Sequence, residues 1–224
     1  MSQTTIATPA AGPATAAPEI VGDDHPVFVF HPGLESFAWF AEARPARLDE
    51  LIVARGCQLV GMGLPGHAGG GLIRFSERYI AQAADEALAV LEQRGHPAAA
   101  AIGVGLGGLV AIELAVRAEG RISCVIVDSL PGAASMEPWR NARGTVNENQ
   151  YRRFVQDIAV RSGYPFLSGA APCPTLVFAC TEPPAALRGA PGTRLVELTC
   201  SPPACRSAAR IFVREVERFL AAYA

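Results

Sequence analysis

The sequence predicts an open α/β fold in which a doubly wound, mostly parallel sheet is covered by helices on both faces. Short apolar segments alternate along the chain with longer segments whose apolar residues recur at helical spacing. The short segments are continuously apolar, as expected of parallel strands that are buried on both sides. A chain of 224 residues is also long enough for one domain with a sizeable core.

The first half of the chain alternates in this way. Residues 27–30 form an apolar strand, and a helix through roughly 38–55 follows. Residues 58–62 form the second strand and lead into turn-forming residues at 64–71. Ser76 can then cap a helix that continues to about Arg94. These elements predict the first strand–helix units of the sheet.

The second half continues the pattern with one interruption. Strands are expected at 122–127, 175–179 and 195–199, and an amphipathic helix at about 207–222. The stretch 133–171 is longer than an ordinary connection and reads as a helical cap insertion over the active edge of the sheet. Its aromatic residues are Trp139, Tyr151, Phe154, Tyr164 and Phe166.

Composition excludes several functional classes. The net charge of −2 and the absence of a basic run argue against a nucleic-acid partner, and no apolar run is long enough to span a membrane. Residues 1–24 read as a disordered tail rather than a secretory signal. The six cysteines lack C-x-x-C spacing, so we expect reduced thiols in a cytoplasmic protein, with no metal and no cofactor.

A glycine-rich turn follows the apolar strand that begins at Ala100, and a helix follows the turn. Gly103 and Gly107 stand at the flanking positions of a G-x-S-x-G nucleophile elbow. The position between them is Gly105, which has no side chain and cannot attack a substrate. The layout therefore predicts the turn of an acyl-transfer enzyme without its nucleophile.

Five motifs in order resemble those of the α/β-hydrolase superfamily over about residues 26–222. The resemblance implies an α/β-hydrolase fold with a short cap. The elbow also resembles that of the N-myc downstream-regulated proteins, an inactive branch of this superfamily. The five motifs are the oxyanion-loop sequence His31-Pro32-Gly33, the turn Leu64-Pro65-Gly66-His67, the elbow 103–108, the strand end Val127-Asp128-Ser129 and the strand 174–178.

The resemblance also shows where this chain departs from the superfamily. It implies that Glu182 stands near the position of the catalytic acid, and that the catalytic histidine belongs within residues 200–204. No histidine follows His96 in the sequence. Because both the nucleophile and the general base are missing, we expect the triad mechanism to have been abandoned.

An elbow without serine still carries backbone N–H groups that can hold a substrate oxygen. The expected donors are Leu106, beside Gly105, and either Gly33 or Leu34. The candidate acid–base groups are His31, Asp128 and Glu182, each of which can instead have a structural role. Trp139 and Phe154 either line an apolar pocket or pack as ordinary core.

Three functions follow from this site. The first is a non-hydrolytic enzyme for cyclisation, isomerisation or related enolate chemistry on a carbonyl-bearing apolar small molecule, as in secondary metabolism. The second is a non-catalytic pseudoenzyme that binds a small ligand or a partner protein. The third is an esterase or thioesterase that uses residues not identified from the motifs. A small-molecule substrate or ligand is the expected partner, no membrane is expected, and a homodimer is left open.

Overall fold

The fold is known from a computed structural model that describes residues 19–21, 25–30, 47–64, 76–118, 120–130, 148–162, 171–183 and 187–224. Seven strands form one sheet in the order β1-β3-β2-β4-β5-β6-β7. Strands β2 to β7 are parallel, and β1 joins the edge antiparallel to β3. The strands are β1 (Glu19–Val21), β2 (Pro26–Phe30), β3 (Gln58–Met62), β4 (Ala99–Val104), β5 (Ile122–Asp128), β6 (Thr175–Ala179) and β7 (Thr193–Glu197).

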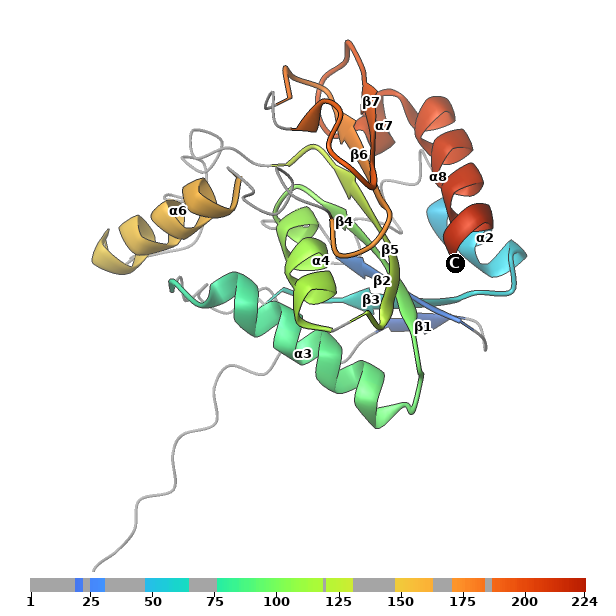
Figure 1. Cartoon of the computed structure of the whole chain (residues 1–224), viewed down its shortest axis with the longest axis horizontal. Helices are drawn as coiled ribbons and strands as arrows, with labels where there is room; N and C mark the ends of the chain where they lie inside the picture. Colours follow the sequence, from blue (N-terminus) through green and yellow to red (C-terminus); the bar gives the residue numbers. More distant parts are fainter. Residues whose placement is uncertain are drawn as a thin grey trace, which may run out of the picture.

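Helices cover both faces of this sheet (Figure 1). Successive strand residues point to opposite faces, so Phe28 and Phe30 of β2 belong to one hydrophobic cluster and Val27 and Val29 to the other. The first cluster includes residues of α3 (Tyr79–Gln93), α4 (Leu106–Arg117) and α6 (Glu148–Ser162). The second includes residues of α2 (Leu48–Ala54), α7 (Ala204–Ser207) and α8 (Ala209–Tyr223).

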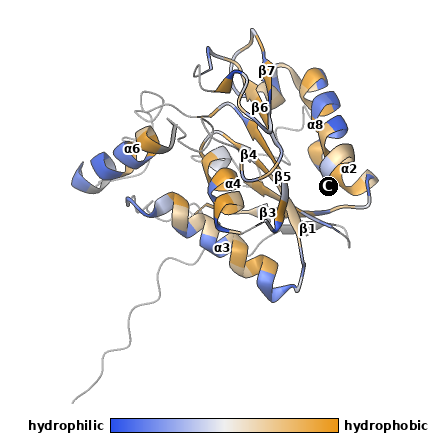
Figure 2. Cartoon of the chain, viewed as in Figure 1, coloured by the Kyte–Doolittle hydropathy of each residue, from blue (hydrophilic) through white to orange (hydrophobic). Residues whose placement is uncertain are grey.

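Helix α8 shows why its sequence forms an amphipathic element. Phe212, Val216 and Phe219 recur at helical spacing and are buried against the sheet. Figure 2 shows the apolar strands inside and strongly hydrophilic segments on α8. No described helix is long and apolar enough to cross a membrane.

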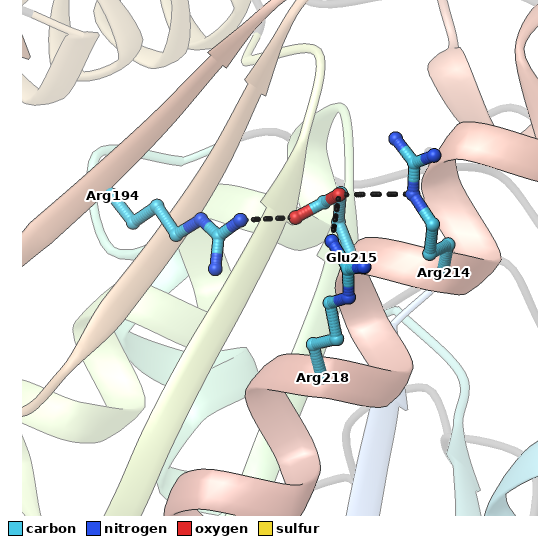
Figure 3. A network of polar contacts seen from close by, with 4 residues as sticks. All are labelled: Arg194, Arg214, Glu215 and Arg218. Carbon is cyan, nitrogen blue, oxygen red and sulfur yellow. Dashed lines mark hydrogen bonds and ion pairs between the residues drawn. The ribbon is translucent and has the colours of Figure 1, made fainter.

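One buried carboxylate joins α8 to the last strand (Figure 3). The side chain of Glu215 is only 7 % exposed, and its Oε1 lies 3.2 Å from Nε of Arg214 and 3.4 Å from Nη1 of Arg218. Its Oε2 pairs with Arg194 of β7. Three half-exposed guanidinium groups therefore compensate one buried charge, and the pair with Arg194 links α8 to β7.

The doubly wound α/β-hydrolase fold predicted from the sequence is confirmed, and most strands begin and end within a residue of expectation. Strand β7 runs over Thr193–Glu197 rather than 195–199, because its half-exposed edge position tolerates Thr193 and Arg194. Helix α3 begins at Tyr79, and the hydroxyl oxygen of Ser76 accepts the Arg78 N–H instead of capping the first turn of α3.

Three other predictions differ from the structure or extend beyond it. The predicted disordered tail, 1–24, is wrong for Glu19–Val21, which form β1. A strand of three residues is too short for its alternation of apolar and polar residues to be recognised in the sequence. The predicted helix at 38–55 is confirmed over Leu48–Ala54, and 38–46 lie outside the described residues. Within the expected insertion 133–171, the structure describes α6, residue 171 and none of the others.

Candidate functional site

The turn between β4 and α4 has the backbone shape of a nucleophile elbow. Gly105 has φ 53° and ψ −120°, a conformation in which a residue with a side chain is strained. Its N–H donates to the carbonyl oxygen of Asp128 at 2.8 Å, and its own carbonyl accepts from Gly108 at 3.0 Å. Two backbone hydrogen bonds therefore hold the apex in place.

Close backbone packing explains the glycine at position 103. A Cβ on Gly103 would lie 2.1 Å from the carbonyl oxygen of Gly107, well inside contact distance. A Cβ on Gly108 would lie 2.7 Å from Cγ1 of Val127. Strand and helix approach too closely here for side chains, so these glycines are required by the turn itself.

The N–H of Leu106 is the backbone donor next to the apex of the elbow. Leu106 is the first residue of α4, so its N–H has no intrahelical acceptor. Its side chain is buried in the core, which leaves only the backbone to face a ligand. The positive end of the α4 dipole favours a negatively charged oxygen at this point.

Asp128 ends β5 beside the elbow and is completely buried. Its Oδ1 accepts the N–H of Ala204 at 2.8 Å, and its Oδ2 accepts the N–H of Cys205 at 2.7 Å. The Ser129 hydroxyl donates to Oδ1 at 2.6 Å. The carboxylate thus anchors the start of α7, at the end of residues 200–204, where the resemblance places the catalytic histidine.

Ser129 and the thiols of Cys180 and Cys200 form a cluster beside Asp128. Ser129 has φ 57°, and its hydroxyl lies 3.5 Å from Sγ of Cys180. Sγ of Cys200 lies 3.2 Å from Sγ of Cys180. Burial is the main cause that raises the pKa of Cys180 to about 12. The signal for this cluster is strand order, because these residues follow three neighbouring parallel strands.

The remaining predicted site residues lie apart or outside the described residues. Glu182 is exposed three residues after the end of β6. Phe154 is completely buried in the core, with its ring 5.3 Å from that of Tyr79 in an edge contact, so it packs as core. His31, Gly33, Leu34 and Trp139 lie outside the described residues. Among the described residues no group of three potential ligands could hold a metal ion.

Comparison with known proteins agrees with this geometry. The profile of the alpha/beta hydrolase family matches residues 28–223. The chain belongs to this family. No curated protein matches the sequence of this family member.

Solved structures of the same fold cover nearly the whole chain. The enol-lactonase from Burkholderia xenovorans is 17 % identical, with a TM-score of 0.64 over 91 % of this chain and 95 % of its own. An alpha/beta hydrolase from a lagoon-sediment metagenome at Mar Chica, Morocco, is 14 % identical, with a TM-score of 0.67. The match covers 92 % of this chain and 94 % of that hydrolase. A thermophilic esterase from Thermogutta terrifontis is 16 % identical, with a TM-score of 0.61 over 92 % and 93 %. At these identities the likeness concerns the fold.

Proposed function

We propose that this alpha/beta hydrolase family member is a non-hydrolytic enzyme for enolate chemistry on a carbonyl-bearing, apolar small molecule. Isomerisation and cyclisation are reactions of this class. The observation that carries the proposal is the elbow conformation of Gly105, kept at φ 53° and ψ −120° without a side chain. Such a turn offers an oxyanion donor and no nucleophile.

The oxyanion hole that we propose has the Leu106 N–H as its first donor. Helix α4 has 12 residues, so its dipole adds to the attraction of an enolate oxygen. The second donor in the proposal is Gly33 or Leu34. Both follow β2 closely in the sequence, and its last residue, Phe30, is paired with Gly103 of β4.

His31 is the proton carrier of the proposed reaction. It directly follows Phe30 in the sequence, next to the proposed donors. Asp128 is less suited, because both of its oxygens already accept backbone N–H groups. Glu182 is exposed and has no described contact with the elbow. Trp139 is the proposed apolar contact for the substrate.

Two observations favour the other functions. The use of Asp128 to anchor α7 favours a pseudoenzyme that only binds a ligand or partner, since it removes one acid–base group from the site. The 2.6 Å contact between Ser129 and Asp128 favours an esterase or thioesterase, since a carboxylate can activate a hydroxyl. The experiments below separate these three functions.

Ester hydrolysis is tested first. Turnover of p-nitrophenyl acetate and labelling by a fluorophosphonate probe should both equal those of the heat-denatured protein. Stoichiometric labelling would contradict the proposal, and labelling at Ser129 that vanishes in Ser129→Ala would establish the esterase function instead.

Enolate chemistry is tested by proton exchange. The protein should accelerate deuterium exchange at the α-carbon of 2-tetralone, an apolar ketone, as followed by NMR. His31→Gln should remove the acceleration, while the matched variant His67→Gln should keep it. Binding of 2-naphthol, an enolate mimic, without any exchange of the ketone would favour the pseudoenzyme.

The position of the site is tested by filling the elbow. Gly105→Leu and Gly33→Val should weaken 2-naphthol binding roughly 100-fold, because losing one oxyanion donor costs ~3 kcal/mol. Gly105→Ala should weaken 2-naphthol binding less than Gly105→Leu does, because its side chain is smaller. Gly189→Leu is the matched control, since Gly189 also has a positive φ of 78° and a Cβ there would meet nothing within 4 Å. Full binding by both blocked variants, with circular dichroism unchanged, would place the site elsewhere.

A further inference from the structure

Two thiols meet at the carboxyl ends of neighbouring strands. Cys180 directly follows β6, and Cys200 lies three residues beyond the end of β7. The two strands are parallel and in register from Thr175 with Thr193 to Ala179 with Glu197. The Leu198 N–H extends this pairing by donating to the carbonyl oxygen of Ala179 at 2.8 Å. The strand pairing itself therefore brings the thiols together.

The contact between the two sulfur atoms is close. Sγ of Cys200 lies 3.2 Å from Sγ of Cys180, and both residues are free and half-buried. The strand ends lie close by, because the Leu198 N–H bonds the Ala179 carbonyl one residue before Cys180 and two before Cys200. Forming a bond between the sulfurs requires only a small further approach and side-chain rotation.

The two thiols differ in their surroundings. Cys200 lines a cavity of about 570 Å³ together with Leu198, Ile211 and the cationic Arg206 and Arg210. Cys180 instead has its Sγ 3.5 Å from the hydroxyl oxygen of Ser129 and faces the buried Asp128 charge. Burial is the main cause that raises its pKa to about 12, and this charge adds to the effect. A thiol must lose its proton to attack a peroxide. Cys200 is therefore the thiol that a small oxidant meets first.

We propose that Cys200 and Cys180 form a redox dithiol, which hydroperoxides oxidise to a reversible disulfide by way of Cys200. This inference does not depend on the proposed function. In the first step Cys200 gives its proton to water and its sulfur attacks the peroxide. The O–O bond breaks, an alcohol or water leaves, and Cys200 becomes a sulfenic acid.

In the second step the sulfur of Cys180 attacks the sulfenic sulfur of Cys200. The S–S bond forms and the S–O bond breaks. The departing hydroxide takes the proton of the Cys180 thiol and leaves as water. The two thiols have then lost two electrons to the peroxide, and an external dithiol restores them by thiol–disulfide exchange.

The position of the disulfide gives it a consequence for the site. It joins Cys180, directly after β6, to Cys200 within the loop between β7 and α7. Asp128 already holds the far end of this loop through Ala204 and Cys205. Oxidation therefore fixes both ends of the segment at which family members carry the catalytic histidine.

Peptide mapping of the full chain tests the inference. After hydrogen peroxide and alkylation, the wild-type protein should lose two reactive thiols and yield one linked peptide pair that contains Cys180 and Cys200. Dithiothreitol should restore both thiols. Cys173→Ser, which removes another half-buried thiol, should behave like the wild type.

The order of the two steps is tested with single variants and dimedone, which traps sulfenic acid. Cys180→Ser should give a dimedone adduct at Cys200, and Cys200→Ser should give none at Cys180. An adduct at Cys180 in Cys200→Ser would overturn the order. A wild-type protein that forms no disulfide, or links other cysteines, would overturn the dithiol whether or not the variants fold.

Discussion

Replacing Asp128 by asparagine tests whether this buried carboxylate is a structural anchor. The change is nearly isosteric but removes the charge and turns one acceptor oxygen into an NH₂ donor. The amide oxygen can still accept from Ala204 or Cys205, and the NH₂ group then faces the other N–H. One charge-assisted hydrogen bond is lost, another is weakened, and a buried N–H loses its acceptor.

The magnitude follows from these losses. A hydrogen bond to a charged group contributes ~1.5–3 kcal/mol, and a buried unsatisfied group costs ~1–3 kcal/mol. Because the two terms overlap, we expect Asp128→Asn to lower the free energy of unfolding by about 3 kcal/mol. For a domain of this size the melting temperature should fall by roughly 6–12 °C.

Urea unfolding followed by circular dichroism measures this loss. Ser129→Ala removes only the hydroxyl that donates to Asp128 and should cost about 1 kcal/mol. Glu182→Gln, at an exposed position, should stay within about 0.5 kcal/mol of the wild type. If Asp128→Asn costs less than about 1 kcal/mol but abolishes ketone exchange, Asp128 is an acid–base group rather than an anchor.

Three more predictions concern the elbow and the last helix. Gly105→Ser should gain no esterase activity in a p-nitrophenyl acetate assay. The strained φ of the new serine should lower the free energy of unfolding by ~1–3 kcal/mol. A large gain in ester hydrolysis would reveal a base near the elbow. Gly103→Ala should destabilise the protein more than Gly108→Ala in thermal unfolding, because the new Cβ meets rigid backbone at Gly107 rather than side chains; equal losses would contradict this. Glu215→Gln should lower the free energy of unfolding by about 1–2 kcal/mol. This loss is smaller than that expected from breaking a fully buried ion pair, because the arginine partners of Glu215 stay solvated. A loss that 1 M NaCl leaves unchanged would contradict a charge-based role for Glu215.

The central strands could be predicted from sequence because parallel pairing buries both faces. Residues 58–62 and 122–128 are almost continuously apolar, and the structure buries nearly all of them. Edge strands carry a weaker signal. Strand β1 has three residues, and β7 begins with Thr193 and Arg194 because one side of it remains accessible.

The candidate site was predictable in its backbone and less so in its side chains. The glycine spacing identified the turn at Gly105, because glycine adopts its positive φ without strain and a Cβ at Gly103 or Gly108 would meet its neighbours too closely. The partners of Asp128 were not predictable, since Ala204 and Cys205 lie far away in sequence and offer backbone groups that carry no side-chain signature.

The elbow persists here for reasons that do not involve a nucleophile. Its shape is set by the bond from the Gly105 N–H to the Asp128 carbonyl, by the Gly108 bond and by the contact of Gly103 with Gly107. A serine at the apex would add strain of ~1–3 kcal/mol, which a hydrolase must tolerate to present its hydroxyl. Glycine avoids this strain and leaves the direction of the Leu106 N–H unchanged. The backbone shape of this turn is therefore separable from the nucleophile, since glycine at the apex maintains it without a side chain.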